Sequence, residues 1–193
     1  MGGTRSVQIL LICGSLRAGS TNEAVLRTAR ASAPQGVEAP IYDGMGALPL
    51  FNPDDDPVEG PAPPAVAELR QQLGKSDGVL LSTPEYAGAL PGPLVNLLDW
   101  TVGGGETYGM PVGFINAAGT AAPTGGASAH ASLRMILGYT GSEIVEAACP
   151  RVPVHRADVG NDGLIADHKA REEIAAAFAA LSERAMRDDH EGG

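Results

Sequence analysis

The chain has 193 residues, 44% of them hydrophobic, which is typical of one globular domain that buries its own core. Its formal net charge of −10 argues against a nucleic-acid partner, because nucleic-acid binders need clustered Lys and Arg. There are two cysteines without a CxxC pattern, no signal peptide and no apolar run of about 20 residues. We therefore expect a cytoplasmic protein without a membrane partner, whose residues 1–193 form a single domain.

The hydrophobic pattern predicts five buried strands. The first is Val7–Cys13, a continuous apolar run of the kind found in strands that are buried on both faces. The others are expected over residues 37–42, 78–82, 111–116 and 143–148. Each gap between them can hold a crossover helix, which favours parallel pairing.

Apolar residues recur between these strands at the three- and four-residue spacing of helices. A last helix is expected over residues 167–187, followed by a frayed tail over residues 188–193. The alternation of strand and helix predicts an α/β fold with a three-layer doubly wound parallel sheet. The helix-marking residues are Val25, Leu26 and Ala29; Val66, Leu69 and Leu73; Leu94, Leu97 and Leu98; Leu133, Ile136 and Leu137; Ile174, Phe178 and Leu181.

In such a sheet, ligands bind beyond the carboxyl ends of the strands. Three loops leave those ends: a first loop over residues 14–22, a second over 84–91 and a third over 117–126. The first loop reads GSLRAGSTN, a pattern that favours anion binding by backbone N–H groups at a helix N-terminus. Ser15, Ser20 and Asn22 can donate further hydrogen bonds, and Arg17 supplies positive charge. The alternative is that Ser20 or Thr21 only caps the helix and that Arg17 is solvated.

Other phosphate-binding motifs fail on the same residues. The loop contains neither Gly-Lys-Ser/Thr nor GxGxxG. A Cys-x5-Arg phosphatase loop needs an arginine where Gly19 stands. Cys13 is therefore expected to be a core residue at the end of its strand.

The second loop lies within the stretch TPEYAGALPGP, in which prolines stiffen the backbone. Such a loop can hold N–H and C=O groups against the edge of a flat heteroaromatic ring. The alternative is an ordinary strand-to-helix turn with Pro91 or Pro93 near the first helical position.

The remaining polar residues predict no metal site. His130, His155, His168 and His190 lack ligand spacing and are expected to be surface or capped residues. The acidic run of residues 54–56 has no EF-hand pattern around it, so it is interpreted as a solvated loop.

Three stretches together resemble the NADPH-dependent FMN reductase family, which includes bacterial quinone, chromate and azo-dye reductases. They are GSLRAGSTN, YDGMGALPLFNPDDD and PEYAGALPGPLVNLLDW, and the similarity extends over residues 8–137. The resemblance implies a flavodoxin-like sheet with strand order 2-1-3-4-5. It implies FMN as cofactor and NADPH or NADH as electron donor.

The resemblance also implies a role for individual residues. Ser15, Arg17, Ser20, Thr21 and Asn22 match the family's FMN phosphate site. The segment Pro84, Glu85, Tyr86 and Ala87 matches the part of the family that lies along the isoalloxazine ring, and Gly119, Thr120, Gly125 and Gly126 match a loop over the ring's other flank. Relatives usually carry Asn, Ser and Lys where this chain has Ala87, Ala89 and Val95.

The activity that this resemblance implies is NAD(P)H-dependent reduction of FMN, with electrons passed to a quinone-like or other small acceptor. Because the cofactor carries the chemistry, we expect no side chain to act as acid, base or nucleophile. A flavodoxin-type electron carrier and a flavin-free scaffold are the alternatives. A homodimer or homotetramer is expected from the apolar stretch of residues 94–100 and from Leu48, Leu50 and Phe51 in a loop.

Overall fold

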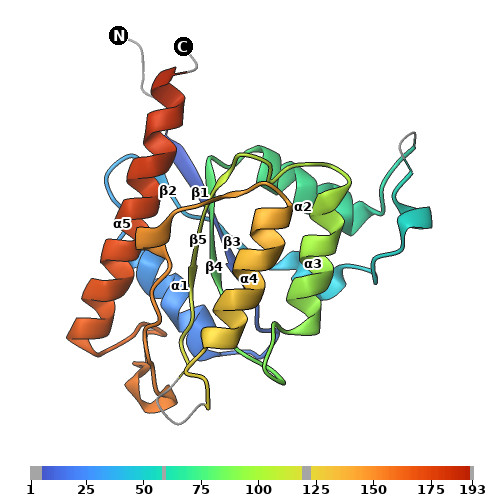
Figure 1. Cartoon of the computed structure of the whole chain (residues 1–193). Helices are drawn as coiled ribbons and strands as arrows, with labels where there is room; N and C mark the ends of the chain where they lie inside the picture. The colour runs from blue at the N-terminus through green and yellow to red at the C-terminus, as the bar shows by residue number, and fades with distance from the viewer. Residues whose placement is uncertain (1–5, 58–59, 119–122, 192–193) are drawn as a thin grey trace.

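The structure is a computed structural model that describes residues 6–57, 60–118 and 123–191. A parallel sheet lies between two layers of helices (Figure 1). Its order is β2-β1-β4-β5-β6, and β3 pairs with β1 beyond the end of β2. The α/β flavodoxin-like fold is confirmed, and the predicted order 2-1-3-4-5 agrees once β2 and β3 are counted as one strand. The strands are β1 Val7–Cys13, β2 Val37–Glu38, β3 Ile41–Tyr42, β4 Gly78–Ser82, β5 Pro111–Ile115 and β6 Glu143–Ile144.

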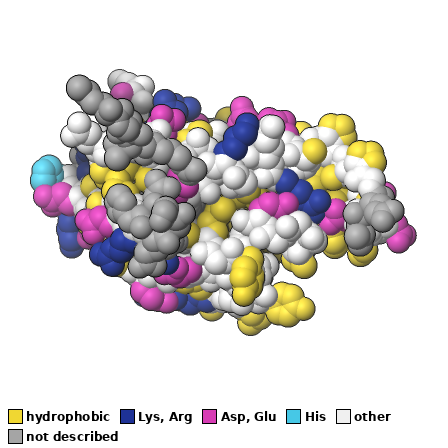
Figure 2. All heavy atoms as spheres, turned by 90° about the horizontal axis from the view of Figure 1, so that it is seen from above, with side chains coloured by type: hydrophobic (Ala, Val, Ile, Leu, Met, Phe, Trp, Pro, Cys, Tyr) yellow, Lys and Arg dark blue, Asp and Glu magenta, His cyan; other side chains and the backbone are white. Residues whose placement is uncertain are grey.

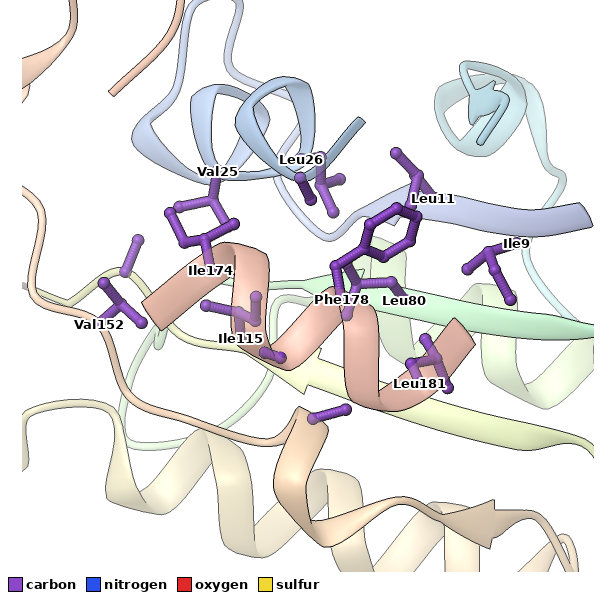
Figure 3. Close-up of a cluster of buried hydrophobic side chains, with 14 of the residues drawn as sticks. Ile9, Leu11, Val25, Leu26, Leu80, Ile115, Val152, Ile174, Phe178 and Leu181 are labelled. Atoms are coloured by element: carbon purple, nitrogen blue, oxygen red, sulfur yellow. The ribbon is translucent and has the colours of Figure 1, made fainter. Parts of the chain in front are cut away.

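Five long helices cover the two faces of the sheet (Figure 1). On one face lie α1 (Thr21–Ala31) and α5 (His168–Glu191), and on the other lie α2 (Pro64–Gly74), α3 (Gly92–Val102) and α4 (Ala127–Tyr139). Strand β1 explains the three layers, because its side chains alternate between the faces. Ile9 and Leu11 pack toward α1 and α5, as Figure 3 shows, whereas Leu10 and Ile12 pack toward the other helices.

Two expected strands are shorter than predicted. The stretch 37–42 is divided into β2 and β3 at Pro40, which has no N–H to donate but accepts from the Leu11 N–H at 2.8 Å. The stretch 143–148 leaves the sheet after Ile144 and forms a 3-10 turn, Glu146–Ala148. Ala148 then packs on Gly113, where a side-chain carbon would come within 2.7 Å of it. In contrast, α5 continues to Glu191, past its expected end at Arg187.

The apolar segment around residues 48–51 is tied to α3 within the same chain. The Pro49 carbonyl accepts from the Trp100 indole N–H and from the Asn96 amide, both at 2.9 Å. The Phe51 ring meets the Trp100 ring edge to face, with centroids 5.0 Å apart. Most apolar residues of α3, including the fully buried Trp100, therefore pack inside the molecule, whereas Val102 at the end of the helix is 53% exposed and Leu50 is 85% exposed.

The sequence suggested that the acidic run of residues 54–56 is a solvated loop. In the structure this run is not wholly solvated. The Asp56 carboxylate forms two hydrogen bonds with the Arg70 guanidinium, at 2.8 and 2.9 Å, which lower the pKa of Asp56. Arg70 also donates to the Trp100 carbonyl near the end of α3. This arrangement fastens the 52–57 segment to α2 and α3. Within the described ranges, no helix has the length and apolar character needed to cross a bilayer.

Candidate functional site

The three loops singled out in the sequence begin at neighbouring strands. The first follows β1, the second β4 and the third β5, and these strands are adjacent in the sheet. All three leave its carboxyl edge, at the bottom of Figure 1, where α1 and α4 also begin. The N-termini of two helices therefore face the region where a ligand is expected.

Ser20 is the N-cap of α1. Its hydroxyl oxygen accepts from the Glu23 N–H at 3.1 Å, so Ser20 does cap the helix, which by itself decides nothing about a bound anion. Capping uses only an acceptor position of the hydroxyl, whose oxygen also lies 3.8 Å from the Cys13 sulfur, a contact in which either atom could donate. The N–H groups of Thr21 and Asn22 have no acceptor in the described parts of the chain. The start of α1 thus combines a cap with open donors.

The other residues of the first loop place charge around this helix start. Arg17 is exposed, and its guanidinium has no partner among the residues that the structure describes. The Ser15 hydroxyl accepts from the Arg17 N–H at 3.3 Å. Glu23 lies beside the loop, where its carboxylate accepts from the Gly19 N–H at 3.1 Å and pairs with Arg27 at 2.8 Å. The Arg27 guanidinium therefore offsets part of the negative charge that Glu23 brings next to the loop.

Asn22 connects the start of α1 to the end of β4. Its side-chain oxygen accepts from the buried Ser82 hydroxyl at 3.1 Å. Asn22 is only 5% exposed, so this contact fixes the orientation of its amide. The amide NH2 group has no hydrogen-bond partner within residues 6–57, 60–118 or 123–191.

A buried amide joins the second and third loops. The Asn116 NH2 group donates to the Thr83 carbonyl, and its oxygen accepts from the Ala118 N–H, both at 2.8 Å. Gly126 passes directly over this amide with φ of +84°, and a side-chain carbon there would lie 2.1 Å from the Asn116 oxygen. Sequence reasoning treated Asn116 as the last residue of a strand. The available signal was a polar residue ending an apolar run.

The Glu85 side chain points to α4. Its carboxylate accepts from the Thr124 hydroxyl at 2.5 Å and from the N–H groups of Ser128 and Ala129 at 3.0 and 3.1 Å. These bonds, that of Thr124 above all, lower the pKa of Glu85. The N-cap position of α4 is Gly126, which has no side chain, so Glu85 supplies the missing cap from another loop. Because the Glu85 side chain is used in this way, only the Glu85 backbone can flank an isoalloxazine ring.

The tip of the second loop is a two-residue hairpin turn. Tyr86 and Ala89 exchange two backbone hydrogen bonds of 3.0 Å, and the residues between them, Ala87 and Gly88, have φ of +50° and +72°. Positive φ at both central positions defines a type I′ turn, for which Asn-Gly is the preferred sequence. Tyr86 presents its ring to solvent, 52% exposed.

The third loop is described in part. Gly119 and Thr120, two of the predicted site residues, lie outside the described residues. Gly125 has φ of +57° and precedes the N-cap of α4. Thr124 was not predicted, yet it links the third loop to the second through Glu85.

Two further titratable side chains, those of His130 and Cys13, lie close to the loops. His130, expected at the surface, is 8% exposed in α4 and meets the Phe114 ring edge to face at 4.8 Å. Burial, with the charges of Arg134 and Arg151, lowers the pKa of His130 to about 4. Burial raises the pKa of Cys13, which lies half-buried beneath the first loop at the end of β1.

Comparison with known proteins agrees with this architecture. The family described as NADPH-dependent FMN reductase matches residues 7–154. An NAD(P)H-dependent FMN reductase of Pseudomonas aeruginosa is 34% identical over 179 residues, covering 91% of this chain and 93% of its own. A quinone reductase of Escherichia coli is 37% identical over 97 residues, about half of each chain (50% and 51%).

A solved structure gives the same result. The flavoenzyme FerB of Paracoccus denitrificans, an NAD(P)H:acceptor oxidoreductase, superposes with a TM-score of 0.79 and 26% identity, over 94% of this chain and 98% of its own. Fold and relatives together define an oxidoreductase of the flavodoxin-like class. This chain belongs to the NADPH-dependent FMN reductase family, as its sequence predicts. Its cofactors are FMN and NAD(P)H.

Replacing Glu85 by Gln should weaken the link between the second loop and α4. At pH 7 we expect a loss of about 1–2 kcal/mol in unfolding free energy, because an NH2 group replaces one of the two oxygens that accept hydrogen bonds. The folded-state pKa of Glu85 lies below its ordinary value of 4.5, so the carboxylate stabilises the fold above that pH. This stabilisation is lost as the pH falls through the folded-state pKa.

Urea unfolding at pH 7 and at about pH 3 measures both effects. Glu183→Gln, at an exposed α5 position, is the matched control and should change little. A difference between Glu85→Gln and the unaltered protein that stays equally large at both pH values contradicts the capping role.

Replacing Ala87 by Asn should stabilise the protein. A left-handed backbone conformation costs a residue with a Cβ about 1–2 kcal/mol, and Asn tolerates it better than Ala does. We expect a gain of roughly 0.5–1 kcal/mol in unfolding free energy, measured by urea denaturation. Ala89→Asn, in the same turn but without positive φ, should bring no gain. Equal effects of the two substitutions would show that the turn is not strained.

Proposed function

We propose that this protein is an NAD(P)H-dependent oxidoreductase that binds FMN among its three loops and reduces a quinone-like or other small acceptor by a ping-pong mechanism. The observation that carries the proposal is the set of unpaired donors at the carboxyl edge of the sheet. Hydrogen bonds of Asn22, Asn116 and Glu85 hold the elements that bear these donors together.

The start of α1 fits the FMN phosphate. In the proposed site, the Thr21 and Asn22 N–H groups and the Ser20 hydroxyl donate to phosphate oxygens, and the Arg17 guanidinium adds a charge-assisted bond. Ser15 lies at the entrance of the same loop. The site is small and polar, and its donors are fixed by α1.

The second loop fits the edge of the isoalloxazine ring. The N–H groups of Glu85, Ala87 and Gly88 have no acceptor in the described part of the chain, whereas those of Tyr86 and Ala89 close the turn. The proposed ring contacts therefore come from the backbone, which the turn and the Glu85 side chain hold in place. FMN, when bound, takes hydride from NAD(P)H and supplies the electrons for the acceptor. The protein orients the ring and limits access to it.

No side chain in the described loops suits proton transfer at neutral pH. The pKa of His130 is lowered to about 4, that of Glu85 is lowered from 4.5, and that of Cys13 is raised from 9.0. None of these three groups changes charge between about pH 6 and pH 8. Tyr86 is the exposed aromatic side chain beside the proposed open face of the ring, where donor and acceptor would stack in turn.

Replacing Arg17 by Ala should weaken FMN binding about tenfold, because a charge-assisted hydrogen bond to phosphate is lost. Riboflavin has no phosphate, so its affinity should not change. Fluorescence titration of both flavins measures the difference. Arg30→Ala, an exposed arginine in the last turn of α1, is the control. Equal weakening of FMN and riboflavin would remove Arg17 from the phosphate site.

Turnover of NAD(P)H and a quinone should give parallel double-reciprocal lines, because both substrates use one open face of the ring.

The rate should vary little between about pH 6 and pH 8. Replacing Tyr86 should change the Michaelis constants more than the affinity for FMN. Intersecting lines would show that donor and acceptor bind together. Absence of NAD(P)H oxidation at saturating FMN would instead favour an electron carrier or a scaffold.

We also propose a homodimer, on different residues from those that the sequence suggested. The residues are Tyr108, Met135 and Tyr139, which are 80%, 76% and 86% exposed. Met135 and Tyr139 lie one turn apart on α4. The Tyr108 ring lies against Gly141, just after that helix. Figure 2 views the end of the molecule where α4 finishes, and hydrophobic side chains protrude at its lower margin. Light scattering at micromolar concentration should show a dimer that Tyr139→Glu dissociates; a monomeric unaltered protein would contradict it.

A further inference from the structure

Arg151 extends the carboxyl edge of the sheet beyond the third loop. It forms a parallel β-bridge with Asn116, and the next residue, Val152, donates its N–H to the Asn116 carbonyl at 2.9 Å. Burial alternates along this segment: Val152 and Val154 belong to the core beneath α1 and α5, whereas Arg151 is exposed. Arg151 therefore lies on the opposite face, on the side where α4 begins.

The Arg151 guanidinium rests against the described part of the third loop. One of its nitrogens lies 3.8 Å from the point where a side chain on Gly125 would begin, and its charge contributes to the lowered pKa of His130. No acidic side chain in the described ranges pairs with it, and no hydrogen bond restrains it. Four other arginines do form ion pairs with acidic residues, namely Arg27, Arg70, Arg134 and Arg184.

An unpaired cation at this position matters because the electron donor is an anion. NADH carries a pyrophosphate, NADPH carries a further 2′-phosphate, and both must approach a chain with a net charge of −10. In the proposed function, the first loop and Arg17 already hold the FMN phosphate. Repulsion between phosphates then favours placing those of the donor away from the first loop. Along the order β1, β4, β5 and β6, Arg151 is a cation that lies beyond the third loop and away from the first.

We propose that Arg151 binds a phosphate group of the NAD(P)H donor. This inference rests on the proposed function for the position of FMN. A planar guanidinium with several donors suits a phosphate better than a single ammonium does. Arg151 lies at the rim of the proposed site rather than under the flavin ring. A residue in this position orients the donor, while Arg17 binds the FMN phosphate.

The test is a calorimetric titration of the FMN-loaded protein with NADP+ and with NAD+, which do not reduce oxidised FMN. Arg151→Gln should weaken the binding of NADP+ about tenfold, through loss of a charge-assisted hydrogen bond. Arg151→Lys should lose less, and Arg30→Gln, which removes the same charge at the far end of α1, should lose nothing. Weakening of NADP+ alone assigns the 2′-phosphate to Arg151, and equal weakening of NAD+ assigns the pyrophosphate.

Kinetics and FMN affinity supply independent readouts. Arg151→Gln should raise the KM of the donor about tenfold while kcat and the Kd of FMN stay within about twofold. Unchanged affinity for both dinucleotides, equally weakened FMN binding, or no dinucleotide binding by the unaltered protein would each overturn the inference. If Arg151 binds NADP+ but the unaltered protein oxidises no NADPH, the proposed function fails and the binding site stands.

Discussion

The buried backbone groups at the carboxyl ends of the central strands impose the constraint on which the site depends. Where a parallel strand ends, its last N–H and C=O groups lose their ladder partners, and an unsatisfied buried group costs about 1–3 kcal/mol. Asn116 satisfies one such group from each of two loops, since its amide bonds the Thr83 carbonyl and the Ala118 N–H. Gly126 closes over the same amide. The beginnings of the second and third loops are thus fixed relative to one another.

The N-termini of α1 and α4 at this edge differ in what they leave free. Helix α4 is capped by the Glu85 carboxylate, an anion that belongs to the protein. Helix α1 is capped by the neutral Ser20 hydroxyl, so its Thr21 and Asn22 N–H groups stay unpaired in the part of the chain that the structure describes. Because a helix N-terminus favours negative charge, α1 rather than α4 retains room for an anion from solution. This difference, rather than loop composition alone, supports the first loop as the phosphate site.

Sequence patterns were enough for the alternating architecture, because continuous apolar runs such as Val7–Cys13 and helical periodicity each report burial directly. They were not enough for features set by distant partners. The division of the second strand at Pro40 follows a local rule, but the departure of residues 146–148 from the sheet depends on Gly113 in another strand. His130 has no sequence signature of burial; it is buried because α4 turns it toward Phe114.

The site shows the same limit. Ser20 and Asn22 could be singled out from the sequence because their loop is contiguous, and the structure shows that Ser20 caps α1. Asn116 and Thr124 act through partners more than 30 residues away, at Thr83 and Glu85, and only the fold brings these together. The family resemblance placed Glu85 along the ring; the sequence did not show that its carboxylate accepts hydrogen bonds from α4, which leaves only its backbone for that role.

The positions at which this chain departs from its family can be weighed by what their side chains do. Ala87 and Ala89 belong to a turn closed by backbone bonds between Tyr86 and Ala89, so their methyl groups remove polarity without removing any donor that the turn positions. Val95 is half-buried on α3 and packs against the core. The N–H groups proposed to hold the ring survive all three changes. What the changes reduce is the number of polar side chains around the proposed open face, which leaves the exposed Tyr86 ring as its main feature. In the proposed function, such a face favours flat acceptors that bind by stacking, because few side chains remain to select one pattern of hydrogen-bonding groups.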